Sequence, residues 1–210
     1  EVFSVYGQAS SASSETSRIL IDFPILTTLS QSRDNGELPT SGSDNLSFYL
    51  RLYNAEHSQT LPKQFTLVAA QASSSWTEGT GLDMDEYSDN GYSNWLYRNS
   101  TTAWDDEGSD ILSGAADTTG SQLFEIGNED LLIDVSTIVE EWLSGDSSSN
   151  GFAVFLTSSQ EDALESYYTK KFFARNSEFK MKRPCIEARW NSSKGDDSKT
   201  FYKSSSLAPA

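Results

Sequence analysis

The stretch Leu46-Ser-Phe-Tyr-Leu-Arg-Leu-Tyr53 alternates apolar and polar side chains along its length. Successive side chains of a β-strand point to opposite faces, so this period of two predicts a strand with Phe48, Leu50 and Leu52 on its buried face. Leucine and the aromatic residues at these positions suit a surface that packs against a core. The stretch therefore predicts a β fold, and the rest of the chain repeats its pattern.

Further alternating stretches extend the prediction to most of the chain. The predicted strands cover residues 2–6, 18–25, 46–53, 64–70, 123–135, 151–157, 167–174 and 185–190. Shared faces are expected for Ile19, Ile21, Phe23 and Ile25 and for Phe65, Leu67 and Ala69. Turn residues such as Asn35-Gly36 and Asn150-Gly151 separate the strands. About eight antiparallel strands with few helices predict an all-β, jelly-roll-like sandwich.

One segment has helical rather than strand spacing. Thr137 and Glu140 are placed as in a capping box, and Gly145 follows as a stop signal. Four apolar side chains between them share one helical face: Ile138, Val139, Trp142 and Leu143. We expect one short helix here, covering one end of the sandwich.

The domain organisation follows from length and composition. Residues 1–190 are expected to form one β-sandwich domain, with a long ordered excursion over residues 73–120 whose aromatic content argues against disorder. Residues 191–210 are polar and are interpreted as a linker or docking tail. Because the chain begins with Glu1 rather than Met, we expect its N-terminus to be a cut or processing point, and the linker-like tail leads us to expect that the chain continues beyond residue 210.

The net charge limits the partners. The chain carries 31 acidic and 15 basic residues, a formal net charge of −16. Such a surface repels phosphate backbones and anionic lipids, so we expect neither nucleic acid nor a membrane as a partner. No apolar run is long enough to span a bilayer.

Acidic residues in the excursion form a candidate cation site. Asp83, Asp85 and Asp89 place several carboxylate oxygens close together in the sequence. Calcium prefers six to eight oxygen ligands in flexible geometry, so this segment is a candidate Ca²⁺ site, although it lacks the EF-hand spacing. The alternative is a solvated acidic loop. No cofactor is required by this interpretation.

Aromatic residues of the excursion form a candidate contact surface. Trp95, Tyr97 and Trp104 can present flat rings to a sugar or to a partner protein. The alternative is that these rings fold back and cover the sandwich.

Catalytic patterns are missing from the sequence. Cys185 and His57 are the single cysteine and the single histidine, and His57 lies in a polar stretch without triad partners. We expect Cys185 to be a small thiol packed in a strand. The sequence contains no Gly-rich phosphate loop, no paired-histidine metal motif and no Gly-x-Ser-x-Gly elbow. We therefore predict that the chain is not an enzyme.

Several short motifs resemble the DNRLRE-type β-sandwich domain, which is related to some carbohydrate-binding modules. They are Trp76-Thr-Glu-Gly79, Asp134-Val-Ser136, Asn150-Gly-Phe152, Phe173-Ala-Arg175-Asn-Ser-Glu178 and Arg183-Pro184. Asp134 and Ser136 can accept from helix N-terminal amides, and we expect Arg175 to pair with Glu178 across a turn.

Longer runs resemble structural proteins of large tailed bacteriophages. They are Ser17-Arg-Ile-Leu-Ile-Asp-Phe-Pro24, Phe48-Tyr-Leu-Arg-Leu-Tyr-Asn54, Trp76-Thr-Glu-Gly-Thr-Gly-Leu-Asp-Met-Asp85, Tyr168-Thr-Lys-Lys-Phe-Phe-Ala-Arg175 and Lys182-Arg-Pro-Cys-Ile-Glu-Ala-Arg-Trp190. The resemblance implies a non-catalytic virion component, such as a capsid decoration or a tail or fibre module, on the virion surface. Its implied partners are other virion proteins or sister subunits in a multi-subunit assembly, and host glycans. The alternative is a carbohydrate-binding module of a secreted bacterial enzyme or adhesin.

Overall fold

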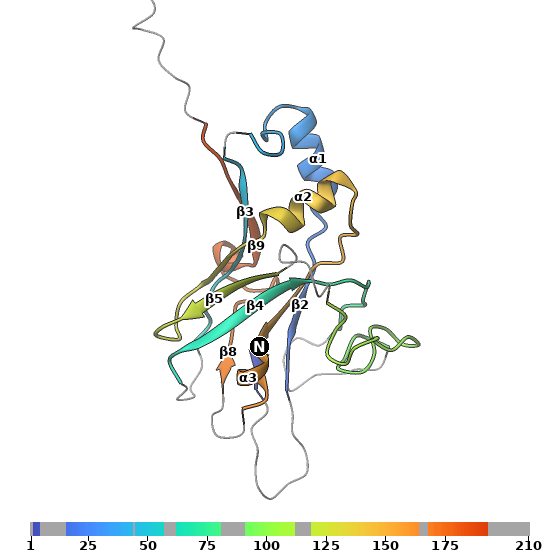
Figure 1. The fold of residues 1–210 in the computed structure, drawn as a ribbon, viewed down its shortest axis with the longest axis vertical. Coiled ribbons are helices and arrows are strands. Elements are labelled where there is room, and N and C mark those ends of the chain that lie inside the picture. The colour runs from blue at the N-terminus through green and yellow to red at the C-terminus, as the bar shows by residue number, and fades with distance from the viewer. Residues whose placement is uncertain are drawn as a thin grey trace, which may run out of the picture.

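The chain folds into antiparallel β-sheets with a few short helices (Figure 1). This computed structural model describes residues 2–4, 16–43, 45–56, 62–80, 91–111, 119–163 and 168–192. The four-stranded sheet has the order β2 (Ile19–Ile21), β7 (Phe152–Leu156), β4 (Phe65–Gln71) and β5 (Thr119–Phe124). The three-stranded sheet has the order β6 (Leu131–Asp134), β3 (Ser47–Leu52) and β9 (Cys185–Arg189). A third, two-stranded sheet pairs β1 (Val2–Phe3) with β8 (Thr169–Lys170).

Both larger sheets contribute side chains to one hydrophobic core. Phe48, Leu50 and Leu52 of β3 are at most 1% exposed, which confirms the face predicted for this strand. The predicted inward face of β4 is likewise buried, and the rings of Phe65 and Phe124 stack with their centroids 4.8 Å apart. The all-β prediction is therefore confirmed.

The segment expected to be one strand over residues 123–135 is two strands. The chain turns between β5 and β6, where Gly127 adopts a φ of +84°. The Glu129 carboxylate stabilises this turn because its Oε1 accepts hydrogen bonds from the amides of Glu125 and Ile126, both at 2.8 Å. Apolar and polar residues alternate on both sides of the turn, so the sequence pattern predicts one continuous strand. The side chain of Gln122 then joins the two strands, since it accepts from the Leu132 amide at 2.6 Å.

The predicted helix is present, but it begins differently from the prediction. Helix α2 covers Ser136–Ser144 and ends at Gly145, whose φ is +83°. The predicted capping box is wrong, because Thr137 lies inside the helix. The first amide of α2 is instead capped by Asp134, whose Oδ1 accepts a hydrogen bond from the Ser136 amide at 2.9 Å.

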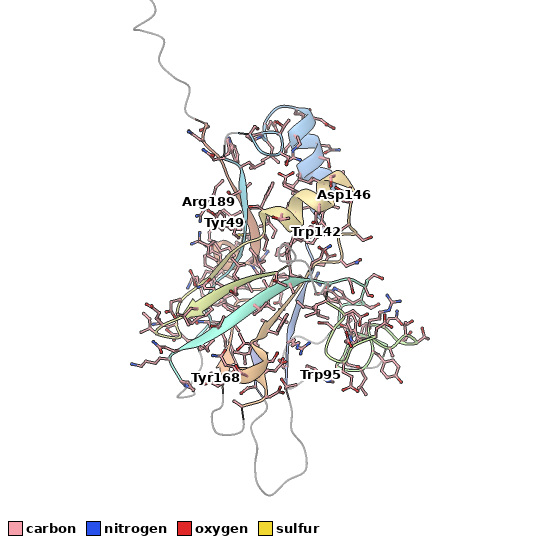
Figure 2. The ribbon with its side chains drawn as sticks, in the orientation of Figure 1. Tyr49, Trp95, Trp142, Asp146, Tyr168 and Arg189 are labelled. Carbon is pink, nitrogen blue, oxygen red and sulfur yellow. The ribbon has the colours of Figure 1, made fainter. Side chains whose placement is uncertain are left out.

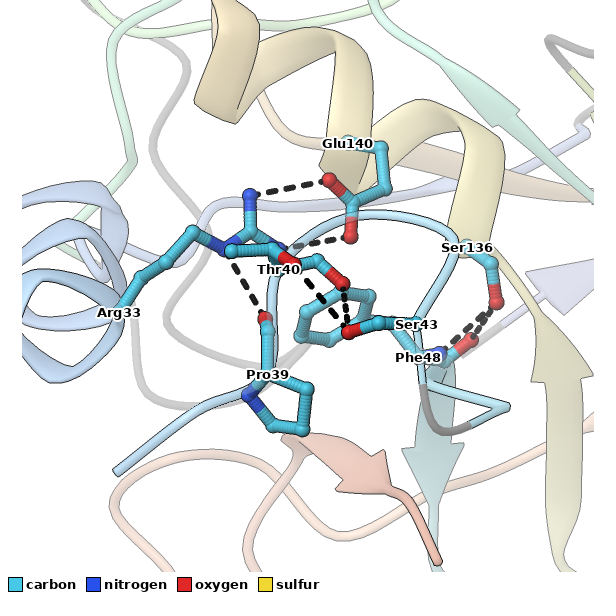
Figure 3. Close-up of polar contacts among 7 residues, drawn as sticks. All are labelled: Arg33, Pro39, Thr40, Ser43, Phe48, Ser136 and Glu140. Atoms are coloured by element: carbon cyan, nitrogen blue, oxygen red, sulfur yellow. Dashed lines mark hydrogen bonds and ion pairs between the residues drawn. The ribbon is translucent and has the colours of Figure 1, made fainter. Parts of the chain in front are cut away.

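The expectation of a single helix is also wrong. Helix α1 covers Leu26–Asp34, and the short elements α3 (Ser158–Glu161) and η2 (Lys180–Lys182) follow later. Helix α1 has no fully buried residue, and Leu26 and Leu29 are its residues that pack against the core, which is too short an apolar stripe for a periodicity search to detect. A two-point ion pair fixes it to α2: the Arg33 guanidinium donates to both carboxylate oxygens of Glu140, at 2.8 and 3.0 Å (Figure 3). Glu140, the other predicted member of the capping box, thus has a different role.

Candidate functional site

A groove of about 690 Å³ opens beside β2. It lies between β2 with the residues that follow it and the segment around Phe172–Arg175. The other lining residues come from β3, the Trp76 segment, the turn before β7 and Pro184: Leu52, Ser75, Trp76, Glu78, Ser149, Asn150 and Pro184. The lining thus combines aromatic and aliphatic side chains with a small number of polar groups, which is the composition of many ligand pockets.

Trp76 is held in place through its polar edge. Its indole Nε1 donates to the backbone oxygen of Asn150 at 2.9 Å. The Asn150 side chain in turn donates from Nδ2 to the backbone oxygen of Ser73 at 3.0 Å. These two bonds join the Trp76 segment to the turn before β7, so Trp76 is positioned by the fold.

Gly151 brings this turn against β2. It has a φ of +82°, and a Cβ atom there would overlap the backbone oxygen of Ile21. Only a glycine satisfies both the left-handed conformation and this close approach. The Asn150-Gly151 pair, identified in the sequence as a turn, therefore also shapes one end of the groove.

The polar part of the rim is an exposed ion pair. Arg175 Nη1 lies 3.0 Å from Glu78 Oε2, and the two side chains are 79% and 54% exposed. The expected pairing of Arg175 with Glu178 is therefore replaced by a pairing with Glu78, which is distant in sequence. Exposed pairs of this kind contribute little to stability. Their guanidinium and carboxylate groups are thus accessible for contacts with a ligand.

The wall opposite β2 is built on backbone pairing. The amide of Phe173 donates to Tyr53 O, and the amide of Ala55 donates to Lys171 O, both at 3.0 Å. Phe173 also packs edge-on against Phe179 with ring centroids 5.8 Å apart. This wall therefore has a defined position relative to β3.

The three aromatic residues predicted as a contact surface have different environments. Trp104 is 6% exposed, and its Nε1 donates to Asn94 O at 2.8 Å. Trp95, which is labelled in Figure 2, is half-buried. The Arg18 guanidinium lies 5.0 Å from its ring centroid, and Gly108 packs against its ring. Tyr97 is 43% exposed. The three rings therefore do not form one open platform, and a contact role stays a prediction for Tyr97 in particular.

The predicted calcium ligands Asp83, Asp85 and Asp89 lie outside the described residues. Within the described part of the chain, no group of three or more His, Cys, Asp or Glu side chains is arranged to hold a metal ion. Cys185 is half-buried on β9, as expected for a packed thiol. Burial raises the pKa of this thiol, which disfavours the nucleophilic thiolate.

The sequence does not predict the groove, although most of its rim residues belong to recognisable motifs. Trp76, Asn150, Phe173, Arg175 and Pro184 all belong to the short motifs of the DNRLRE resemblance. These residues are far apart in the sequence, so their proximity could not be predicted from it.

None of the helices in the described residues is long and apolar enough to span a bilayer.

Comparison with protein-family models, with curated proteins and with solved structures gives no match for this chain.

Proposed function

We propose that this chain is a non-catalytic, jelly-roll-like β-sandwich module that acts as a structural and interaction component of a tailed-phage particle. The sharing of one core by the two larger sheets supports the sandwich architecture. The resemblance of the long sequence runs supports the virion role. As a capsid decoration or a tail or fibre module, it would contact sister subunits or other virion proteins at the virion surface.

The groove is the observation that carries an interaction role. Apart from the groove rim, three arginine ion pairs of the described residues join separate elements of the fold: Arg18 with Glu161, Arg33 with Glu140, and Arg51 with Glu187, which also pairs with its strand neighbour Arg189. The Arg175–Glu78 pair instead lies exposed beside an apolar groove. Apolar lining with an accessible charged rim suits recognition of a partner or ligand.

Quantitative proteomics of purified particles tests the virion role. We expect the protein at a copy number comparable to that of other structural proteins. Absence from particles, with the protein present in the lysate, would overturn the proposal. A second comparison uses Trp76→Ala, which we expect to reduce incorporation into particles, and Arg189→Ala on the three-stranded sheet as a control that is incorporated normally.

A carbohydrate-binding module is the second candidate, and the composition of the rim favours it. Trp76 and Phe173 supply aromatic surface, while Glu78 and Arg175 supply hydrogen-bonding groups suited to sugar hydroxyls. A glycan array on the purified chain tests this candidate. Binding that Trp76→Ala abolishes and Tyr97→Ala preserves would place the sugar in the groove, whereas the reverse pattern would place it on the excursion.

A further inference from the structure

Lys170 is an unusual residue in the core because its charged side chain is fully buried. Its Nζ donates to Asn54 Oδ1 at 2.7 Å, to Glu129 O at 2.8 Å and to Gly127 O at 2.9 Å. The rings of Phe124 and Phe172 lie 5.0 and 5.4 Å from Nζ. Burying an ammonium group is costly even when it is hydrogen-bonded. The position of the Lys170 side chain beside the Asn54 amide therefore needs an explanation.

The backbone holds the Lys170 amine and the Asn54 amide together. Asn54 is bridged to Phe172 in antiparallel fashion. Lys170 lies two residues before Phe172 and therefore on the same face of the strand. The bonds from Phe173 to Tyr53 and from Ala55 to Lys171 fix this register on both sides. The contact between Nζ and the amide is thus imposed by strand pairing rather than by a chance rotamer.

The environment makes the Lys170 amine available as a nucleophile. Burial lowers the pKa of Lys170 to about 8, while the negative charges of Glu129 and Asp130 act in the opposite direction. A desolvated lysine with a lowered pKa is a typical activated amine. Glu129 adds a carboxylate whose Oε2 is buried and has no hydrogen-bond partner.

We propose that Lys170 and Asn54 form an intramolecular isopeptide bond without any other protein. The neutral amine attacks Asn54 Cγ, which forms the Nζ–Cγ bond and a tetrahedral intermediate. The Cγ–Nδ2 bond then breaks, and Nδ2 leaves as ammonia with a proton that comes from Nζ. Transfer of this proton is assigned to Glu129, because its buried Oε2 has no hydrogen-bond partner and its negative charge acts on Lys170. The reaction exchanges one amide for another, so it needs no oxidant, reductant or activated co-reactant.

The cross-link would join Lys170, the last residue of β8, to Asn54, which lies two residues after the end of β3. It would close a covalent loop through residues 54–170, which limits how far the chain can extend when it is unfolded or pulled. This inference does not depend on the virion role or on the groove.

The first test is the intact mass of the purified wild-type chain, measured under denaturing conditions. We expect a mass lower than the sequence mass by one ammonia. Digestion and tandem mass spectrometry should give one branched peptide that joins the segment of Asn54 to the segment of Lys170. A wild-type mass equal to the sequence mass, or an ammonia loss that maps to another asparagine, would overturn the proposal.

Variants separate the cross-link from other mass changes. Lys170→Met and Asn54→Ala should each restore the full mass expected from the variant sequence. Lys182→Met is the matched control, because Lys182 also lies over aromatic rings, 5.0 Å from that of Phe173, but has no part in the proposed bond. It should keep the ammonia loss, and a loss that persists in Lys170→Met would contradict the assignment. The wild-type measurement decides the question even if a variant fails to fold.

Discussion

Arg18 and Glu161 form a two-point ion pair in which Nε and Nη2 of the arginine each donate to one carboxylate oxygen at 2.7 Å. The side chains are only 18% and 10% exposed. Arg18 precedes β2, and Glu161 lies in α3 after β7, so the pair joins two segments that are remote in sequence. The same guanidinium lies 5.0 Å from the ring centroid of Trp95 and 5.1 Å from that of Phe155. One side chain therefore links the four-stranded sheet, α3 and the loop that carries Trp95.

We expect Arg18→Ala to be strongly destabilising. The substitution leaves the largely buried Glu161 carboxylate without its partner, and such losses cost roughly 3 kcal/mol. It also removes the cation from the Trp95 ring, so the environment of that tryptophan should change. The free energy of unfolding from urea denaturation, with tryptophan fluorescence recorded in the native state, measures both effects.

The control is Arg175→Ala, which breaks a pair of similar length on the exposed rim of the groove. We expect it to change the free energy of unfolding by less than about 1 kcal/mol. Similar decreases in the free energy of unfolding for Arg18→Ala and Arg175→Ala would contradict the expectation that burial makes the Arg18–Glu161 pair the more stabilising one.

Gly151→Ala should disrupt the junction of β7 with β2. A Cβ atom at this position would meet the backbone of Ile21 and Asp22, and the φ of +82° adds strain for any residue with a side chain. We expect a loss of roughly 2–4 kcal/mol. Gly36→Ala is the matched control, because Gly36 has a φ of +71° but open space around it, so it should lose about 1 kcal/mol. Calorimetric unfolding of both variants separates the steric effect from the conformational one.

Arg33→Ala should release α1 without unfolding the sheets. Helix α1 has no fully buried residue, so apart from the half-buried Leu26 and Leu29 it is fastened by the bonds of Arg33 to Glu140 and to Pro39 O (Figure 3). Loss of about 1–2 kcal/mol of local stability would raise amide exchange in Leu26–Asp34 by about five- to thirtyfold. Hydrogen exchange measured by mass spectrometry should show this increase in α1 and no change in β3. An unchanged α1 would mean that the ion pair is not what holds it.

The sequence predicts the strands whose alternation reflects burial on one face. The faces of β3 and β4 follow from this rule, and so does the apolar side of α2, where Ile138, Val139 and Trp142 are buried. Helix α1 could not be predicted in this way, since only Leu26 and Leu29 of it pack against the core and a long-range ion pair supplies its other anchor. The turn at Gly127 was missed because the side chain of Glu129, which stabilises it, has no distinctive sequence pattern.

The groove shows a different limit of sequence reasoning. Trp76, Asn150 and Arg175 were quoted as separate motifs, but their proximity depends on how β2, β7 and the Phe172–Arg175 segment pack. The aromatic residues of the excursion are close in sequence, which favours them as a predicted contact surface. Trp104 is nevertheless buried, and its indole nitrogen is bonded within its own loop. Closeness along the chain is therefore a poor substitute for packing when a ligand site is assigned.

The rate of the proposed Lys170–Asn54 cross-link should increase with pH. The attacking group is the neutral amine, and burial lowers the pKa of Lys170 to about 8. Below that pH the ammonium form predominates and has no lone pair, so two pH units below the pKa the rate should be about a hundredfold lower than its plateau. Above pH 8 the amine is mostly neutral and the rate should level off. An unperturbed lysine would instead keep accelerating toward pH 10.

Protein recovered unfolded from inclusion bodies, with its full sequence mass, can be refolded at a series of pH values to measure this rate. The ammonia loss is then followed by intact mass over time. Glu129→Gln should slow the reaction at every pH, since an amide does not carry a proton between Nζ and Nδ2. The charges of Glu129 and Asp130 both raise the pKa of Lys170, so the variant should also shift the midpoint of the profile to lower pH. A rate independent of pH, or a midpoint near that of a solvent-exposed lysine, would contradict attack by a buried Lys170 amine.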